Sequence, residues 1–530
     1  MSSSQAAANS LYNDIDPEIP FIPYPERIRN MAQKHPDRIA LKCEGRVRTW
    51  NELMPRVNKV SHFLKAQGLT RGDKVAVLAK SSVEYVEVFL GTLQAGCCIV
   101  PLSGMASSVQ LEGMIKNSEA KILMISRSTK ELVDPFIGGL SGFSRKNCLG
   151  FDFEDDRWTS YDTAIETASD AEFITDISPE DPFNLIYSSG TTGVPKGIEQ
   201  SHYMRSQHTF RFENLGMGPE AVTLTSTALY SNTTLVVMLP TLALGGQLIL
   251  MPKFNTDEYL KLAEAERVTH SMLVPVQYQR ILAHPDFDKF DLSCFEIKFS
   301  TSAPLREGVK LDALKRWPGK LVEMYGLTEG GIGTVLSATD YPDKLASVGM
   351  AGEGVDLRII DEEGQEVDQG RIGEIVGRSD AMMTGYYNRQ DLTDEMLWTS
   401  PDGKIFFKSG DMGRFDEDGF LFLLDRKKDM IISGGFNIYA ADIEAELDAH
   451  PEVEDVAVIA IPSEEWGETP LALVVLTEGS NSTSDTLKTW VNERLGKSQR
   501  VSGVVLRDDL PRSTIGKVLK RELREEYSEI

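Results

Sequence analysis

One stretch of this chain combines glycines, small hydroxyl side chains and a single lysine in a way that suits phosphate binding. It reads YSSGTTGVPKG, from Tyr187 to Gly197, and it follows a short apolar segment that predicts a strand. A glycine-rich turn at the carboxyl end of a strand lets backbone N–H groups approach an anion, while hydroxyls add donors and a lysine adds charge. A flexible linker is the alternative interpretation, because polar glycine-rich loops are common.

The loop does not match the Walker A pattern. That pattern needs a lysine followed directly by Ser or Thr at the start of a helix. Here Lys196 is preceded by Pro195 and followed by Gly197. P-loop kinases and ATPases are therefore excluded. The function of the loop must be inferred together with other motifs in the chain.

The elements around the loop predict a parallel sheet with helices on both faces. Between residues 25 and 180, helical patterns such as PERIRNMAQKHP alternate with strand patterns such as KVAVLAK. The alternation resumes after the loop with a helix for which Ser201 is the expected N-cap. Alternation of this kind implies a largely parallel sheet. The predicted fold class is α/β, with a large N-terminal domain of stacked mixed sheets.

The last third of the chain has a different pattern of apolar and turn residues. From about residue 350, short alternating runs with turn signals such as DEDG indicate antiparallel hairpins. After Met430 a helix with Ile443 and Leu447 on one face, two strands and a second helix could form a unit of its own. We therefore predict a large domain over residues 1–427, with a β-rich subdomain over about 350–427, and a small α+β domain over residues 428–530.

Composition narrows the partners and the compartment. The formal net charge is -25 with a pI near 4.8, which argues against nucleic acid and anionic membranes as partners. Five cysteines without metal-ligand spacing indicate reduced thiols. The first residues lack the pattern of a signal peptide, and the longest apolar stretch is broken by Pro240 and Gly245. We expect a cytoplasmic protein with no integral membrane segment, and a homodimer is the working expectation for its oligomeric state.

Six segments resemble, in family order, the signatures of the adenylate-forming superfamily, which contains acyl-CoA synthetases, adenylation domains and luciferases. The resemblance covers nearly the whole chain from about residue 25 and is strongest to AMP-forming acyl-CoA synthetases. It implies that a carboxylate and ATP give an acyl-adenylate and pyrophosphate, and that a thiol then displaces AMP. The segments are YSSGTTGVPKG, STSAPL from Ser300, MYGLTEGG from Met324, KSGDMGRFDEDGF from Lys408, DRKKDMIISGGFNIYAADIE from Asp425 and LPRSTIGKVLKREL from Leu510.

The resemblance implies an ATP site with Mg2+. Thr328 would contact phosphate, and Glu329 would coordinate Mg2+, a hard cation that prefers oxygen ligands. Asp411 would accept hydrogen bonds from the ribose hydroxyls, and Arg426 would support the ribose or a phosphate. The phosphate loop would hold the β- and γ-phosphates through Ser188, Ser189, Gly190, Thr191, Thr192, Gly193 and Lys196. The adenine slot would be formed by Ser302, Ala303, Pro304, Tyr325 and Gly326.

The same resemblance places catalysis and the thiol step in the C-terminal part. Lys517 would bridge the carboxylate and the α-phosphate, and so offset their repulsion in the transition state. Lys428 stands at the family's hinge position, so rotation of a mobile C-terminal domain would withdraw Lys517. Ser433, Gly434 and Gly435 would then flank the path of CoA, the second substrate.

The acid pocket departs from the common family pattern. Many relatives have a histidine where this chain has Ser231, and amino-acid adenylation domains have an aspartate that pairs with the substrate's amino group. Ser231 cannot carry that charge, which argues against an amino-acid substrate. No basic residue is apparent for a second carboxylate. The pocket would include Tyr230, Ser231, Thr234, Val276, Gln277, Gly330 and Gly331.

We therefore predict an acid–thiol ligase, an AMP-forming acyl-CoA synthetase that takes ATP, Mg2+, CoA and a hydrophobic monocarboxylic acid. Fatty, aryl-alkanoic and terpenoid or steroid side-chain acids all stay open. One alternative is a stand-alone adenylating enzyme that loads the phosphopantetheine thiol of a carrier protein. A second alternative, from another class, is a non-catalytic nucleotide-binding regulator, against which the intact Lys517, Glu329 and Lys196 argue.

Overall fold

The structure is a computed structural model that describes most of the chain, and the described residues form two compact units. The first unit runs up to Leu345 and also takes Gly352–Asp356 and Arg378–Phe407. The second takes Ala346–Ala351, Leu357–Gly377 and the residues from Lys408 onward. The described residues are 21–188, 196–427, 429–433, 436–463, 466–496, 499–513 and 516–528.

One sheet of the first unit is mostly parallel, as the alternation of strands and helices predicts. Its strands follow the order β15-β14-β13-β12-β10-β11-β1-β2. The edge strands β2 and β15 are antiparallel to their neighbours, and the others are parallel. The strands are β1 (Ile39–Cys43), β2 (Arg46–Thr49), β10 (Val222–Thr225), β11 (Gln247–Leu250), β12 (His270–Leu273), β13 (Ile297–Ser300), β14 (Lys320–Gly326) and β15 (Gly333–Ser337).

A second sheet of this unit carries the ends of the phosphate loop. Its order is β19-β9-β8-β4-β3-β5-β6-β7; β9 is antiparallel to both of its neighbours, β8 and β19, and the other pairs are parallel. Separately, β20 (Leu397–Thr399) pairs with the start of β21 (Ile405–Phe415). The strands of the second sheet are β3 (Lys74–Leu78), β4 (Cys98–Pro101), β5 (Ile122–Ile125), β6 (Cys148–Gly150), β7 (Thr159–Ser160), β8 (Pro182–Ser188), β9 (Lys196–Ser201) and β19 (Gly385–Tyr386).

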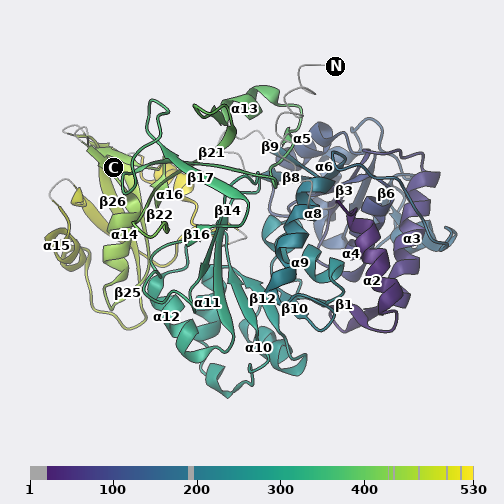
Figure 1. Ribbon diagram of the computed structural model, residues 1–530, viewed down its shortest axis with the longest axis horizontal. Helices are drawn as coiled ribbons and strands as arrows, with labels where there is room; N and C mark the ends of the chain where they lie inside the picture. The colour runs from purple at the N-terminus through teal and green to yellow at the C-terminus, as the bar shows by residue number, and fades with distance from the viewer. Residues whose placement is uncertain are drawn as a thin grey trace. The chain divides into compact units, whose positions relative to one another are not determined.

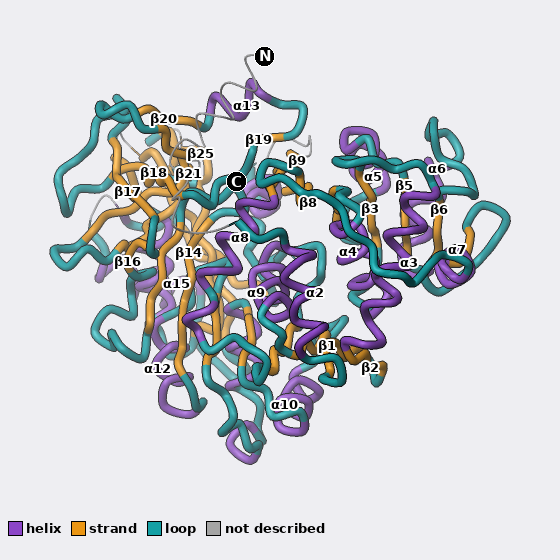
Figure 2. The backbone as a smooth tube through the Cα atoms, turned by 45° about the vertical axis from the view of Figure 1, so that its right-hand side comes forward, coloured by secondary structure: helices purple, strands orange, loops and turns teal. Residues whose placement is uncertain are grey.

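Helices α2, α8 and α9 of the first unit pack side by side (Figures 1 and 2). Ser201 caps α8 as predicted, because its hydroxyl accepts a hydrogen bond from the Met204 N–H at 3.1 Å. One large core cluster contains residues of both sheets and of α2 and α9. The helices are α2 (Tyr24–Lys34), α3 (Trp50–Ala66), α4 (Val83–Gln94), α5 (Ser108–Ser118), α6 (Lys130–Ile137), α7 (Tyr161–Glu166), α8 (His202–Arg211), α9 (Asn232–Ala243), α10 (Thr256–Ala265), α11 (Pro275–Leu282), α12 (Glu307–Arg316) and α13 (Gln390–Glu395), with the short 3-10 helices η1 (Arg127–Thr129), η2 (Glu213–Leu215) and η3 (Phe287–Lys289).

The second unit contains the predicted hairpin and the predicted C-terminal elements. Strands β21 and β22 are antiparallel around the DEDG turn. A second sheet has the order β24-β23-β26-β25, with β27 beside β26, and Ile443 and Leu447 of α14 are buried in its core. The elements are β16 (Met350–Ala351), β17 (Val355–Ile360), β18 (Gly373–Ser379), β22 (Leu421–Arg426), β23 (Ile431–Ser433), β24 (Phe436–Ile438), α14 (Ala440–Asp448), β25 (Val453–Ser463), β26 (Gly467–Leu476), α15 (Ser484–Arg494), β27 (Gly503–Arg507) and α16 (Lys520–Glu526).

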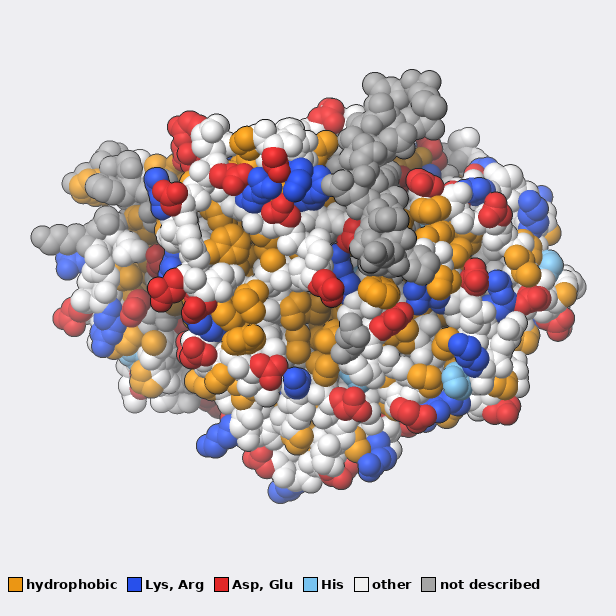
Figure 3. Space-filling view, viewed as in Figure 1, with side chains coloured by type: hydrophobic (Ala, Val, Ile, Leu, Met, Phe, Trp, Pro, Cys, Tyr) orange, Lys and Arg blue, Asp and Glu red, His pale blue; other side chains and the backbone are white. Residues whose placement is uncertain are grey.

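The α/β fold class with a large and a small unit is confirmed. The domain boundary that the sequence predicts between residues 427 and 428 stays a prediction; the two compact units divide the chain at other residues, and Lys428 lies outside the described residues. All five cysteines are free thiols, as predicted. Within the described ranges, no helix is both long and apolar enough to cross a bilayer. On the face seen in Figure 3, acidic and basic side chains are interspersed.

Candidate active site

Two strands bring the ends of the phosphate loop together. Ser188, the last residue of β8, pairs with Lys196, the first residue of β9. Ser189, Gly190, Thr191, Thr192 and Gly193 lie outside the described residues, and so does the side chain of Ser188. The Lys196 ammonium lies 5.6 Å from the ring centroid of Tyr386. Lys196 is therefore placed at the base of the loop, against an aromatic ring.

Tyr386 also binds the predicted magnesium ligand. Its hydroxyl donates a hydrogen bond to Glu329 Oε1 at 2.8 Å. Burial, with the adjacent Glu329 carboxylate, raises the pKa of Tyr386, so this hydroxyl keeps its proton. The Met383 N–H donates to the Glu329 carbonyl at 2.7 Å, which fixes the backbone as well. The structure thus gathers Lys196 and Glu329 at one tyrosine that the sequence patterns did not single out.

The segment around Thr328 is tied to the strand that leaves the phosphate loop. The Gln200 amide, on β9, donates to the Thr328 carbonyl at 2.5 Å. The next turn needs glycine at position 330, because φ is +74° and an added Cβ would overlap the Ala381 carbonyl oxygen. The Gly331 N–H donates to that same carbonyl at 3.1 Å. Hydrogen bonds and close packing therefore hold residues 328–331 on both sides.

The predicted adenine segment is a constrained turn beside the end of β14. Ser302 has a positive φ of 78°, an uncommon conformation for a residue other than glycine. Its hydroxyl lies 2.6 Å from that of Thr233, at the start of α9. The Leu305 N–H donates to Glu323 Oε1 at 2.7 Å, which anchors the other end of the turn to β14. Ala303 and Pro304 belong to this turn, and Tyr325 and Gly326 end β14.

The predicted acid-pocket side chains are neutral, and several are already hydrogen-bonded. Ser231 caps α9, with its hydroxyl 3.3 Å from the Thr233 nitrogen. The Thr234 hydroxyl donates to the Ala228 carbonyl at 2.7 Å. The Gln277 amide donates to the Ser226 hydroxyl at 3.0 Å and accepts from the Val274 N–H at 3.1 Å. Tyr230 and Val276 are half-buried, while Gly330 is buried.

In the second unit, the two predicted ribose residues form a cross-strand ion pair. Asp411 on β21 pairs in register with Arg426 on β22, and Arg426 Nε lies 3.2 Å from Asp411 Oδ1. The Asp411 N–H donates to the Ser409 hydroxyl at 2.9 Å, and Asp411 as a whole is buried. Ser433 ends β23, whereas Lys428, Gly434 and Gly435 lie outside the described residues.

Lys517 sits on a tight turn with several hydrogen bonds. The Ser513 N–H donates to the Lys517 carbonyl at 2.8 Å, and the Lys517 N–H donates to the Ser513 hydroxyl at 3.2 Å. Arg512 donates to the Gly516 carbonyl at 2.5 Å and forms an ion pair with Asp455 on β25. Arg512 therefore braces the turn that carries Lys517.

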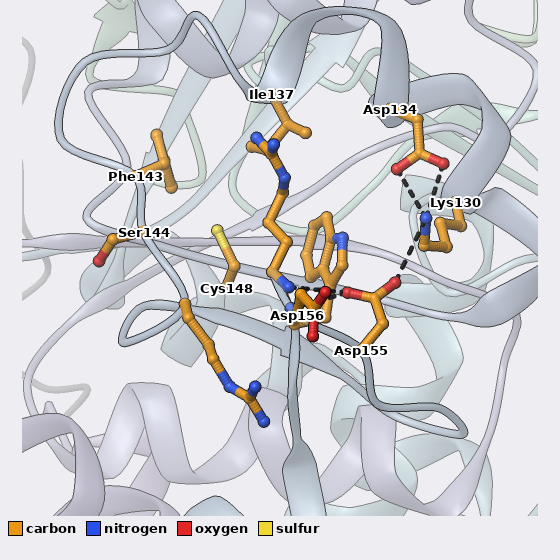
Figure 4. A pocket seen from close by; sticks show the side chains of 11 residues that line it. Lys130, Asp134, Ile137, Phe143, Ser144, Cys148, Asp155 and Asp156 are labelled. Atoms are coloured by element: carbon orange, nitrogen blue, oxygen red, sulfur yellow. Dashed lines mark hydrogen bonds and ion pairs between the residues drawn. The ribbon is translucent and has the colours of Figure 1, made fainter.

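A separate cavity of about 550 Å³ in the first unit contains none of the predicted site residues (Figure 4). It lies around α6 and β6, where Lys130 forms ion pairs with Asp134 and Asp155. Arg145, another lining residue, forms an ion pair with Glu154, and the buried Cys148 also lines the cavity. The predicted site residues of the first unit lie elsewhere, at the loop ends, in the segment around Glu329 and at the start of α9.

Comparison with known protein families supports the predicted resemblance. The AMP-binding enzyme model matches residues 28–387, and the model of the AMP-binding enzyme C-terminal domain matches residues 442–517. The chain therefore belongs to the AMP-binding enzyme family, whose members form adenylates.

Particular relatives cover almost the whole chain. A feruloyl-CoA synthase from Amycolatopsis sp is 33% identical over 94% of this chain and 97% of its own length. A long-chain-fatty-acid–CoA ligase from Bacillus subtilis is 30% identical over 98% of this chain and 97% of its own. The crystal structure of ATP-bound MatB from Rhodopseudomonas palustris is 30% identical, with a TM-score of 0.86, and the match covers 96% of this chain and 99% of that one.

Proposed function

We propose that this enzyme is an AMP-forming acyl-CoA synthetase for a hydrophobic monocarboxylic acid. It activates the acid with ATP to an acyl-adenylate and pyrophosphate, and then transfers the acyl group to the thiol of CoA with release of AMP. Relatives along the whole chain that are named acid–CoA ligases support the reaction. The neutral lining of the acid pocket supports the substrate class.

That neutrality is the observation on which the substrate class rests. The lining segments, residues 230–234, 274–278, 300–302 and 330–334, contain no charged residue. Thr233 bonds to Ser302 within these segments, and Thr234 and Gln277 bond to Ala228 and Ser226 just outside them. Among the described residues of these segments, the buried Ser300 hydroxyl has no hydrogen-bond partner. A bound acid would therefore meet few unsatisfied polar groups beyond its carboxylate, which favours an apolar acyl chain.

The phosphate end of the site suits ATP with Mg2+. Tyr386 takes one oxygen of Glu329, and the other oxygen can ligate a cation. Mg2+ commonly binds to one or two carboxylates together with substrate phosphates. No group of three or more His, Cys, Asp or Glu side chains that could hold a metal ion occurs in the described part of the chain. When bound, Mg2+ would neutralise phosphate charge, while Lys196 and Thr328 hold the leaving pyrophosphate.

The remaining steps fall to the second unit. Asp411, oriented by Arg426, would accept hydrogen bonds from the ribose hydroxyls. Lys517, held on its braced turn, would place an ammonium between the carboxylate and the α-phosphate. Rotation at Lys428 would then exchange Lys517 for the segment that contains Ser433, Gly434 and Gly435, which would line the CoA path.

A panel assay tests this proposal. Acid-dependent pyrophosphate release is measured over acids from acetate to steroid acids, with free CoA and a holo-carrier protein as alternative acceptors. We expect release with a hydrophobic acid and formation of its CoA thioester. Failure of every acid to give a CoA thioester would refute the CoA ligase, and a thioester on the carrier alone would favour the carrier-loading alternative.

Variants separate catalysis from nucleotide binding. Lys517→Ala should lower adenylation by two orders of magnitude or more, because a positive charge at the transition state is lost. Arg521→Ala is the matched control, since Arg521 is an exposed basic residue of the same tail that lies near Glu525. Equal pyrophosphate release by Lys517→Ala and the unaltered enzyme would show that Lys517 has no catalytic role.

A further inference from the structure

Helix α8 buries a charged side chain next to the predicted acid pocket. Arg205 is 1% exposed. Its guanidinium donates to Asn184 Oδ1 at 3.0 Å and to Asn232 Oδ1 at 2.9 Å, and it lies 3.3 Å from His208 Nδ1. All three partners are uncharged side chains. The sequence patterns indicated no basic residue at this place, because Arg205 lies in a helix outside every signature segment.

No carboxylate balances this charge among the residues that the structure describes. The titratable groups that act electrostatically on Arg205 are Tyr24 on α2 and His208 on its own helix. Burial raises the pKa of Tyr24, whose hydroxyl donates to the Leu239 carbonyl at 3.0 Å, so it stays neutral. Burial, with the charge of Arg205, lowers the pKa of His208 to about 3, so it is also neutral.

A buried cation without a counter-ion is costly, even where neutral groups satisfy its hydrogen bonds. Burial lowers the pKa of Arg205 to about 9, so the guanidinium is still charged at neutral pH. Neither Tyr24 nor His208 offsets this charge, because both are neutral. An anion bound nearby would supply the missing charge, and in this reaction the acid itself is an anion.

The hydrogen bonds of Arg205 lead to both halves of the predicted site. Asn232 is the first residue of α9, directly after Ser231 of the acid pocket. In the other direction, Asn184 donates to Gln200 Oε1 at 2.8 Å, and Gln200 donates to the Thr328 carbonyl. Because a guanidinium only donates, Asn232 turns its amide oxygen toward Arg205 and its NH2 group away.

We propose that Arg205 is a positioning residue for the carboxylate of the acid substrate. It orients the Asn232 amide as a donor at the start of α9, and its buried charge favours the ionised acid over neutral analogues of the same shape. This inference rests on the proposed function, in which residues 230–234 line the acid pocket.

Arg205 could instead have a purely structural role, in which its hydrogen bonds only link α8 to β8 and α9. That role makes a different prediction. Loss of these structural hydrogen bonds would weaken binding of a carboxylic acid and of its carboxamide to the same degree, because both have the same shape. Loss of a charge would weaken binding of the acid alone. The ratio of the two affinities therefore separates the roles.

The experiment measures dissociation constants for three pairs by calorimetry, with α,β-methylene-ATP and MgCl2 at pH 6.5. The pairs are ferulate and ferulamide, indole-3-acetate and indole-3-acetamide, and octanoate and octanamide. The pair that binds the unaltered enzyme most tightly is then measured with Arg205→Met, Arg205→Lys and Asn232→Ala. We expect Arg205→Met to lower the acid-to-amide affinity ratio about tenfold, and Arg205→Lys to keep it within about threefold. Asn232→Ala should lower the ratio too, and it carries the test if Arg205→Met does not fold.

Lys298→Met is the matched control. Lys298 is also fully buried, and it donates only to the carbonyls of Trp317, Pro318 and Gly319. Residues 317–319 precede the first residue of β14, whereas Ser302 follows the last residue of the parallel neighbour β13. The contacts of Lys298 and Ser302 therefore lie at opposite ends of these strands. The control should lower the melting temperature and leave the acid-to-amide ratio unchanged.

Three outcomes count against the inference in distinguishable ways. An unchanged acid-to-amide affinity ratio in both Arg205→Met and Asn232→Ala would show that Arg205 has only a structural role. Preference for octanedioate over octanoate that Arg205→Met abolishes would show that Arg205 binds a second carboxylate, which overturns its positioning role. If neither these three acids nor any hydrophobic acid of the pyrophosphate-release panel binds the unaltered enzyme, the hydrophobic-acid function itself is refuted, and the assignment of Arg205 is refuted with it.

Discussion

Tyr386→Phe should impair adenylation through the position of Glu329. The change removes a hydroxyl that donates to Glu329 Oε1 at 2.8 Å and leaves the ring beside Lys196 in place. A hydrogen bond to a charged group contributes about 1.5–3 kcal/mol. Since the site is only partly buried, the lower end applies, which corresponds to about a tenfold change. We expect pyrophosphate release to fall about tenfold, with half-saturation at a higher Mg2+ concentration.

The assay is acid-dependent pyrophosphate release over a MgCl2 titration. Tyr387→Phe is the control, because the Tyr387 hydroxyl bonds to Lys74 at 3.0 Å and to Glu119 at 2.7 Å instead of Glu329. Both variants lose one hydroxyl from adjacent positions, and their melting temperatures show whether either is destabilised. An identical Mg2+ dependence in Tyr386→Phe and the unaltered enzyme would refute the view that this hydroxyl positions a magnesium ligand.

Three further variants and conditions test the rest of the site. Gly330→Ala should cost at least about 2–3 kcal/mol, because the new Cβ overlaps the Ala381 carbonyl oxygen at a positive φ, and thermal unfolding measures the loss. Asp411→Asn should raise KM for ATP about tenfold while KM for the acid stays constant, since the ion pair with Arg426 is lost; a shift confined to the acid would contradict the ribose role. Burial lowers the pKa of His202 to about 3, below 6.5 in the unfolded chain, so the unfolded state binds more protons between these values. Stability should therefore fall as pH drops from 6.5 toward 3, and a His202→Phe variant that shows the same fall in melting temperature would exclude His202 as its source.

Much of the fold follows from local patterns. The alternation of buried strands and amphipathic helices predicts the parallel sheets, because each element must bury one face or both. Ser201 was predictable as a cap, since a hydroxyl before an apolar-periodic run satisfies free backbone N–H groups. The β21–β22 hairpin follows from a turn of Asp and Gly residues between alternating runs. Each of these signals is complete within about twenty residues.

The side chains that position the site carry no such signal. Tyr386 meets Glu329 across 57 positions of sequence, and Gln200 meets Thr328 across 128. Such contacts depend on which strands become neighbours, which no local periodicity specifies. The signature segments identify residues that touch ATP by resemblance, whereas their supports lie outside those segments. Tyr386 follows a glycine in MTGYYNR and was indistinguishable from an ordinary core tyrosine.

The predicted acid pocket is also supported by side chains that lie far from it in the sequence. The family resemblance drew attention to Ser231, where it implies a histidine, but the hydroxyl of Ser231 caps α9. The shape of the pocket therefore depends on how the start of α9 is held. Two of the contacts that hold it join residues distant in sequence, one from Thr233 to Ser302 and one from Arg205 to Asn232, across 69 and 27 positions. If Arg205 positions the acid as we propose, a substitution in α8 will alter the choice of acid while all six signature segments stay intact, and two chains that share those segments need not share a substrate.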